Sequence, residues 1–307
     1  MLFFIETVIS GLMAGVMYSL VALGFVLIFK ASGIFNFAQG VFALFAGLAL
    51  YDFISTDGWF YELFGFVLPA WLGIIATMGV MVIVAWLVEF LVLRHLVNQE
   101  PIILFMSTIG LAYFLEGLGD TLFGSDVKPL NLGLPSGAWD YLLDNYNLYV
   151  EKLEIVAAVV AAVLVTVLAI FFQKTRIGRA LRAVADDHQA ALSVGISLRT
   201  IWVIVWSVSG FVALVAGIMW GSKSGIQFSL SLIALKALPV LILGGFTSVP
   251  GAIVGGLIIG VGEKVAEVYA GPFVGGAIEN WFAYMLALVF LLVRPQGLFG
   301  EKIIERV

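Results

Sequence analysis

The sequence contains no cysteine and carries little charge. Without Cys among its 307 residues, disulfides, thiolate metal sites and cysteine nucleophiles are excluded. Charged residues make up only 11% of the chain and hydrophobic residues 62%, whereas a soluble domain carries about 25% charged residues. Several apolar runs reach the ~20 residues that cross a hydrocarbon core of ~30 Å. The composition therefore predicts an all-α polytopic membrane protein, with residues 1–307 forming a single transmembrane domain.

Motifs for nucleotide hydrolysis and catalysis are also missing. No Gly-x-x-x-x-Gly-Lys-Ser/Thr run occurs, so we expect this chain not to hydrolyse nucleotide by itself. The histidines, His95 and His188, stand far apart in predicted loops, and no Ser/His/Asp grouping indicates hydrolysis inside the membrane. No chain of acidic residues and histidines marks a proton relay. We therefore expect no enzyme activity, no cofactor or metal in this chain and no nucleic-acid partner, with energy supplied by another chain.

Nine apolar segments are candidate membrane spans. If one of them were re-entrant, eight would cross, so the prediction is about eight or nine transmembrane helices. Their ranges are 7–29, 35–54, 67–93, 101–120, 151–172, 200–221, 231–247, 251–269 and 274–293. Between the fourth and fifth spans, residues 121–150 are acidic and rich in Gly, Pro and Asn, which predicts an external loop with room for a short helix.

Positive charge gathers in one segment, residues 173–199. Five of the chain's 15 Lys and Arg residues lie there, and basic loops face the cytoplasm. This basic segment is therefore predicted to be cytoplasmic, which places the 121–150 loop outside. With nine spans, the N-terminus is external and the C-terminus is cytoplasmic.

Residues 178–194 of the basic segment favour one or two short helices. Alanines provide a small apolar face, and Gly195 is the residue type that commonly follows a helix C-terminus. Two interpretations fit this pattern: a plain positive-inside loop, or a cytoplasmic helix that docks on a soluble partner through close-packed small residues and arginine ion pairs. Under the second interpretation, the candidate docking residues are Arg176, Gly178, Arg179, Arg182, Asp186, Asp187 and Gly195.

Two glycine-containing breaks interrupt the apolar pattern near the two ends of the chain. The first, at 30–40, contains Asn36, a good N-cap for the next helix. In the second, at 244–256, Pro250 fits the first turn of a helix capped by the Ser or Thr before it. Paired interruptions indicate inverted repeats around a transport path, although ordinary tight turns explain them equally well. The candidate path residues, which offer hydrogen bonds without fixed charge, are Asn36, Gln39, Thr247 and Ser248.

Four separated motifs resemble the permease subunits of branched-chain amino acid ABC importers. The sequence Gly-Arg-Ala-Leu-Arg-Ala at 178–183, with Gly-Ile at 195–196, resembles the cytoplasmic loop of that family. Residues 33–40 and 243–256 resemble its two broken-helix motifs, and Arg-Pro-Gln-Gly-Leu-Phe-Gly at 294–300 resembles its C-terminal ending. Because the chain starts directly at the first broken pair, we expect it to correspond to the shorter of the two paralogous permeases of the high-affinity system.

Two positions depart from the family pattern. The first motif of the family usually has an acidic residue soon after its glycine, but Val41-Phe42-Ala43 follows Gly40 here, which bears on the substrate. The coupling pattern Glu-Ala-Ala followed by a distant Gly appears only loosely, as Ala185-Asp186-Asp187.

The resemblance implies the type II ABC importer permease fold, in a bacterial inner membrane. It also implies a second permease subunit, paralogous or identical, two cytoplasmic ATPase subunits that use ATP and Mg, and a periplasmic solute-binding protein. Energy would enter through the basic segment, and small neutral or zwitterionic solutes would cross by alternating access. Branched-chain amino acids are the first expectation for the substrate, with urea, short amides or aromatic acids as alternatives. A self-sufficient carrier or channel is the alternative from a different class.

Overall fold

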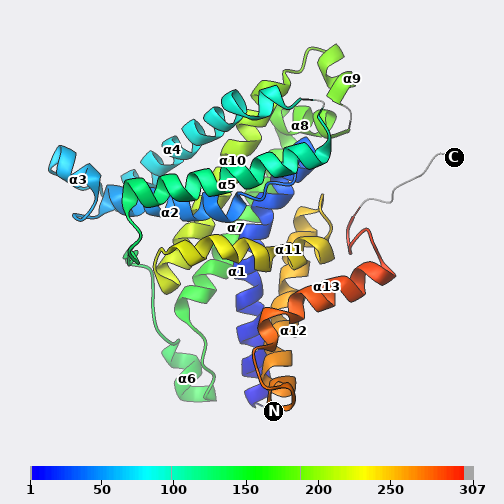
Figure 1. Ribbon diagram of the computed structural model, residues 1–307. Coiled ribbons are helices and arrows are strands. Elements are labelled where there is room, and N and C mark those ends of the chain that lie inside the picture. Colours follow the sequence, from blue (N-terminus) through cyan, green and yellow to red (C-terminus); the bar gives the residue numbers. More distant parts are fainter. Residues whose placement is uncertain (1, 98, 187, 301–307) are drawn as a thin grey trace. The chain divides into compact units, whose positions relative to one another are not determined.

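The computed structural model describes residues 2–97, 99–186 and 188–300, and all of its long secondary-structure elements are helices (Figure 1). Within these residues, seven helices are long and apolar enough to cross a membrane. They are α1 (Leu2–Ser32), α2 with α3 (Gln39–Ile54 and Trp59–Phe64), α4 with the 3-10 helix η1 (Ala70–Leu91 and Leu93–His95), α5 (Pro101–Phe123), α7 (Lys152–Lys174), α10 (Leu198–Ser224) and α12 (Val249–Val274). The all-helical, polytopic fold expected from composition is confirmed.

Two of the nine predicted spans are shorter than a full membrane crossing. The seventh corresponds to the 3-10 helix η2 (Phe228–Leu232) followed by α11 (Ile233–Gly244), and the ninth to α13 (Phe282–Val293). The ninth starts late because Gly275 and Gly276 have positive φ angles and a 3-10 turn, η3 (Ile278–Asn280), follows them. Glycine tolerates positive φ angles, and such angles lie outside the right-handed helical region. The helix therefore cannot begin at these two glycines, where hydropathy alone would place its start.

The chain forms two compact units, each built from separate stretches of sequence. The first, called the α1/α12 unit here, contains the residues up to Val26, Leu134–Thr166 and the residues from Leu235 onward. The second, called the α2/α10 unit, contains Leu27–Gly133 and Val167–Ala234. Each unit includes one of the predicted helix breaks.

The α2/α10 unit is organised around α2, which is buried along nearly its whole length. Helices α4, α5 and α10 pack around it (Figure 1). Gly217 of α10 allows a close approach to α2, because a Cβ there would lie 2.5 Å from the carbonyl oxygen of Ala43. Phe42 and Trp206 then meet edge to face with ring centroids 5.7 Å apart. Small residues and aromatic contacts are how helices gain packing energy where lipid removes the hydrophobic driving force.

The α1/α12 unit is held by glycines at the crossing of its two long helices. Gly11 and Gly15 of α1 face Gly260 and Gly256 of α12, and a Cβ on any of them would collide with the opposite backbone. The Ser19 hydroxyl extends the same contact by hydrogen-bonding to the carbonyl of Ala252 at 3.2 Å. Glycines four residues apart on both helices form a small-xxx-small interface, which allows the backbones to touch.

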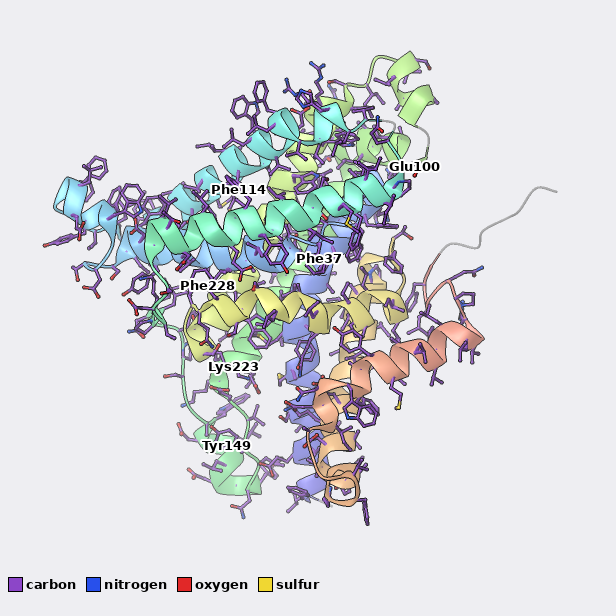
Figure 2. All side chains as sticks on the ribbon, viewed as in Figure 1. Phe37, Glu100, Phe114, Tyr149, Lys223 and Phe228 are labelled. Carbon is purple, nitrogen blue, oxygen red and sulfur yellow. The ribbon has the colours of Figure 1, made fainter. Side chains whose placement is uncertain are left out.

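Apolar side chains cover the outward faces of α4, α5 and α7. Only 22–33% of the most apolar window of each of these helices is buried within the chain. Phe114 of α5, marked in Figure 2, is 65% exposed. Exposed apolar surface on this scale is typical of helices that face lipid or a second membrane subunit.

The predicted short helix in the acidic loop is confirmed as α6 (Asp140–Tyr146). Next to it, Ala138 pairs with Glu151 as an isolated antiparallel bridge. Lys152 donates to the Asp140 carboxylate at 2.9 Å, which holds the pKa of Asp140 below its usual value. The loop is therefore folded against the start of α7.

Candidate functional site

The basic segment begins with a tight turn between α7 and α8 (Arg176–Asp186). The Thr175 hydroxyl oxygen accepts a hydrogen bond from the Gly178 N–H at 2.9 Å, which caps the start of α8. A Cβ on Gly178 would collide with the carbonyl oxygens of Phe171 and Phe172 at the end of α7. Glycine is therefore required at this corner, because any side chain would push α8 away from α7.

Helix α8 presents its arginines to solvent, together with Ile177, which is 39% exposed. Arg176, Arg179 and Arg182 are exposed and three residues apart, so they share one face. Leu181 and Val184 lie on the opposite face and are 2% and 0% exposed, so they are buried within the α2/α10 unit, to which α8 belongs. Burying these two apolar side chains fixes the arginines as a projecting basic surface, called the α8 arginine face below.

The rest of the basic segment forms the second short helix expected from its sequence, α9 (His188–Ser193). Gly195 has a φ of +83° and its N–H bonds to the Leu192 carbonyl at 3.0 Å, so it ends the helix as predicted. Helix α10 then starts with a capping bond from the Thr200 N–H to the Ser197 hydroxyl. Asp187 and the side chain of Asp186 lie outside the described residues, and their docking role stays a prediction.

The first helix break lies between α1 and α2, where Gly33 has a φ of +67°. Asn36 Oδ1 accepts from the Ala38 N–H at 3.1 Å, so Asn36 stabilises the turn while Ala38 holds the N-cap position itself. The hydroxyl oxygen of Thr108 in α5 accepts a hydrogen bond from the Phe37 N–H at 3.0 Å. The irregular backbone is thus satisfied by side chains, as a break at membrane depth requires.

Asn36 and Gln39 are fully buried inside the α2/α10 unit. The Asn36 amide donates to Gln39 Oε1 at 3.4 Å, and the Ser209 hydroxyl of α10 donates to the same oxygen at 2.7 Å. These two predicted path residues therefore form one polar cluster with Ser209. Sequence reasoning missed Ser209, because nothing near it in the sequence distinguishes it from other serines in apolar helices.

The second helix break lies in the α1/α12 unit, between α11 and α12. Gly245 has a φ of +103°, and the Ser248 hydroxyl accepts from the Gly251 N–H at 3.0 Å as the N-cap of α12. Pro250 occupies the first turn, as predicted. Gly244 and Gly251 touch backbone to backbone, so a Cβ on either would collide with the carbonyl of the other. Thr247 and Ser248 are half-buried beside this contact.

The C-terminal motif packs on the second break. The N–H groups of Leu298 and Phe299 donate to the carbonyls of Leu243 and Gly244 at 2.8 and 3.1 Å. These carbonyls belong to the last turn of α11, where a helix has no partners of its own for them. Two sequence motifs about fifty residues apart therefore build one structure, and the C-terminal motif caps α11.

A cluster of charged residues joins α11, α12 and η3 in the α1/α12 unit. Lys236 donates to Glu263 at 2.5 Å, and Lys264 donates to Glu279 at 2.8 Å. Glu267 accepts the backbone N–H groups of Ala277 and Glu279, each at 3.0 Å. The bond from Lys264 lowers the pKa of Glu279, so this carboxylate stays ionised. No local sequence pattern pairs Lys236 with Glu263, because the two residues are 27 positions apart.

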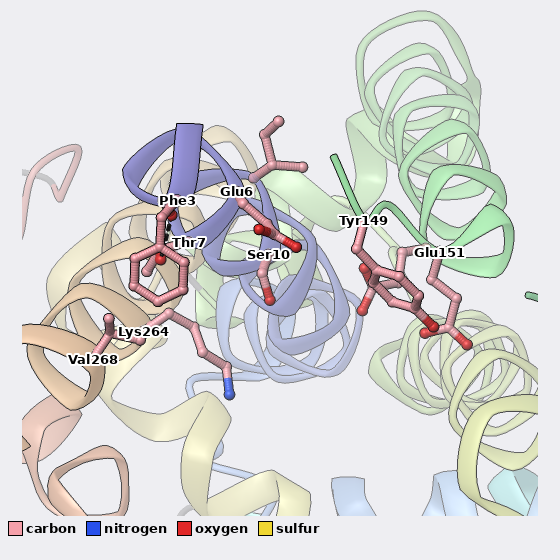
Figure 3. A pocket seen from close by; sticks show the side chains of 10 residues that line it. Phe3, Glu6, Thr7, Ser10, Tyr149, Glu151, Lys264 and Val268 are labelled. Carbon is pink, nitrogen blue, oxygen red and sulfur yellow. Dashed lines mark hydrogen bonds between the residues drawn. The ribbon is translucent and has the colours of Figure 1, made fainter. Parts of the chain in front are cut away.

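A cavity of about 220 Å³ lies in the same unit, between α1, α12 and the segment before α7 (Figure 3). Glu6 and Ser10 line it from α1, Lys264 from α12, and Tyr149 and Glu151 from the loop. Its lining combines apolar surface with three carboxylates, Glu6, Glu151 and Glu154, and one lysine, Lys264. Among the described residues, no group of three or more His, Asp or Glu side chains has the arrangement of a metal site.

Paired helix breaks, an all-helical membrane fold and a projecting basic helix together give the organisation of a transport permease. The family described as branched-chain amino acid transport system / permease component matches residues 7–294. The chain therefore belongs to this family.

Similar proteins align with this chain over nearly its whole length. The high-affinity branched-chain amino acid transport system permease protein LivH of Escherichia coli (strain K12) is 27% identical over 322 residues, covering 100% of this chain and 98% of LivH. BraD of Pseudomonas aeruginosa, of the same description, is 27% identical and covers 99% and 98%. A probable LivH of Methanocaldococcus jannaschii is 25% identical and covers 92% and 88%. PsaBC from Streptococcus pneumoniae in complex with Fab aligns with a TM-score of 0.46 at 15% identity, over 92% of this chain and 89% of that chain.

Proposed function

We propose that this chain is the membrane-spanning subunit of an ATP-driven importer that moves branched-chain amino acids into the cytoplasm. The α8 arginine face is the observation that carries the proposal. Exposed arginines on a helix fixed by buried Leu181 and Val184 form a rigid basic surface, which fits a soluble partner with an acidic cleft. Family membership supports the importer class, and full-length similarity to LivH and BraD supports the substrate.

Energy enters from the partner in this proposal. Two ATPase subunits bind ATP and Mg, and their movement is passed to the membrane helices through α8. Because Gly178 lets α8 abut the end of α7, a push on α8 is transmitted directly to that helix. A solute-binding protein delivers the solute from outside, and a second permease, paralogous or identical, completes the path. The basic segment and the C-terminus are cytoplasmic, and the N-terminus is external.

Uncharged polar groups line the proposed path. Asn36 and Gln39 are placed at one break and Thr247 and Ser248 at the other, and none carries fixed charge. Hydrogen bonds from such groups recognise a zwitterion weakly enough to release it. Since Asn36 and Gln39 are buried and bonded to each other, solute reaches them only when the path opens.

Reconstitution tests the proposal most simply. The tagged chain, coexpressed with its candidate ATPase and permease partners, is purified and placed in liposomes with the solute-binding protein. Uptake of labelled leucine, urea, a short amide and phenylalanine is measured with and without ATP. We expect leucine uptake that needs ATP and the ATPase subunits. Uptake by this chain alone would establish a self-sufficient carrier, and preference for another solute would change the substrate.

A further inference from the structure

A second cavity, of about 480 Å³, lies beside the basic segment within the α2/α10 unit. The end of α4 and η1 form one wall, and the linker from α9 into α10 forms the other. No residue of the two helix breaks lines it. It is therefore separate from the path residues described above.

One wall of this cavity includes a buried carboxylate, Glu89, in which only one of the two oxygens has a hydrogen-bond partner. Glu89 is 1% exposed, and its Oε2 accepts from Arg94 at 2.9 Å. The Arg94 guanidinium also lies over the ring of Phe90, 4.1 Å from its centroid, so the pair is fixed in place. Among the described residues, Glu89 Oε1 and Arg94 Nε have no hydrogen-bond partner. Buried polar groups are almost always bonded, so the cavity is where a donor for Glu89 belongs.

The opposite wall supplies positive charge and apolar surface. Arg199 is exposed and lines the cavity from the first turn of α10. Val97, Leu192 and Leu198 line it as well, together with Trp202. An occupant that suits these walls carries an N–H donor for Glu89, an anionic group for Arg199 and an apolar body between them. A simple anion meets only the second requirement, because it leaves Glu89 Oε1 without a hydrogen-bond donor.

We propose that this cavity binds a zwitterionic amino acid with an apolar side chain. The ammonium group bonds to Glu89, the carboxylate pairs with Arg199, and the side chain packs on Leu192 and Leu198. The inference rests on the proposed function, since an imported amino acid would reach the cavity from the cytoplasmic side. It adds a site beyond the path, next to the segment through which the ATPase subunits act.

The natural absence of cysteine makes a protection experiment direct, because single-cysteine variants need no other change. Leu192→Cys places a thiol on the cavity wall, and Val194→Cys places one two residues away, at an exposed position that does not line the cavity. Both are made in the full chain, assembled with its partners in nanodiscs. The rate of maleimide labelling is then measured with increasing leucine.

We expect leucine to slow labelling at Leu192→Cys at least fivefold and to leave Val194→Cys unchanged. Adding Arg199→Gln should raise the half-protecting concentration at least tenfold, whereas Lys223→Gln, at an exposed lysine outside both the cavity and the α8 arginine face, should not change it. Glu89→Gln should weaken protection similarly. Because Glu89→Gln also alters the bond to Arg94, the surface variant Arg199→Gln is the decisive one.

Equal labelling rates with and without leucine would overturn the site, as would equal slowing at both positions. Protection by inorganic phosphate or anionic lipid, but not by leucine, would show an anionic headgroup site and would overturn it too. ATP-driven uptake by the wild-type complex is measured in parallel. Normal leucine uptake without protection refutes this inference alone, whereas protection without any uptake refutes the proposed function alone.

Discussion

The Lys236 ammonium group lies 2.5 Å from the Glu263 carboxylate, joining α11 to α12 a few turns from the second helix break. Glu263 is 1% exposed, so its charge is compensated by this partner and not by water. Tyr18 of α1 lies next to this pair, with the centroid of its ring 5.7 Å from Lys236 Nζ. The pair therefore fixes the helix that leads into the break.

Removing one partner should destabilise the protein strongly. Lys236→Met leaves a buried, uncompensated carboxylate, and the expected loss is about 3–5 kcal/mol. The double variant Lys236→Met with Glu263→Leu should recover most of that loss, because it removes both charges. Thermal unfolding in detergent measures both. If the single and double variants unfold at the same temperature, the two side chains are not energetically coupled.

Close backbone contact at the second break predicts a clear contrast among glycines. Gly251→Ala should destabilise the protein by at least the ~1–3 kcal/mol typical of overpacking, because its Cβ would collide with the Gly244 carbonyl. Gly79→Ala is the matched control, since Gly79 is an exposed glycine inside α4 with nothing within 4 Å of a new Cβ. That variant should be neutral or stabilised by up to ~1 kcal/mol through helix propensity. Equal effects at both positions would contradict the close contact.

The path role of Gln39 can be separated from its structural role. Gln39→Leu and Ser209→Ala each remove the bond between the Ser209 hydroxyl and Gln39 Oε1. Both should therefore lose about 1–3 kcal/mol of stability. Only Gln39→Leu also removes the amide from the path, so its KM for uptake should change more. Equal uptake constants in the two variants would confine Gln39 to packing.

Because the chain has no cysteine, single-cysteine variants can also test which side of the membrane each loop faces. A membrane-impermeant maleimide should label His188→Cys only from the cytoplasmic side, because basic segments stay inside. Asp144→Cys, in α6 of the acidic loop, should be labelled from outside in intact cells. Labelling of His188→Cys from outside would reverse the proposed orientation.

Local signals in the sequence predicted much of this fold. Apolar run length predicted the long helices, and Pro250 with the polar residue before it predicted the start of α12. Gly195 predicted the end of α9. These features depend on neighbours in the chain, so the sequence contains them directly.

Contacts between distant residues were not predictable in the same way. The bond between Gln39 and Ser209, the pair of Lys236 and Glu263, and the packing of Leu298 on α11 each join residues far apart in sequence. No local pattern encodes these pairings. The late start of α13 was missed for a different reason, since hydropathy does not register backbone conformation at Gly275 and Gly276.

Coupling through the α8 arginine face is the central claim of the proposed mechanism. Arg179→Glu reverses an exposed charge on α8 without disturbing the buried Leu181 and Val184, so the protein should insert and fold normally. Gly178→Trp should disrupt the same coupling by forcing α8 away from α7. Lys223→Glu, an exposed charge reversal near the other end of α10, is the matched control.

ATP-driven leucine uptake by the reconstituted complex, compared between wild type and Arg179→Glu, is the most direct measurement. Coupling through the α8 arginine face predicts that Arg179→Glu abolishes uptake and lowers co-purification of the ATPase subunits, while Lys223→Glu retains both. Normal ATP-driven uptake by Arg179→Glu would contradict it.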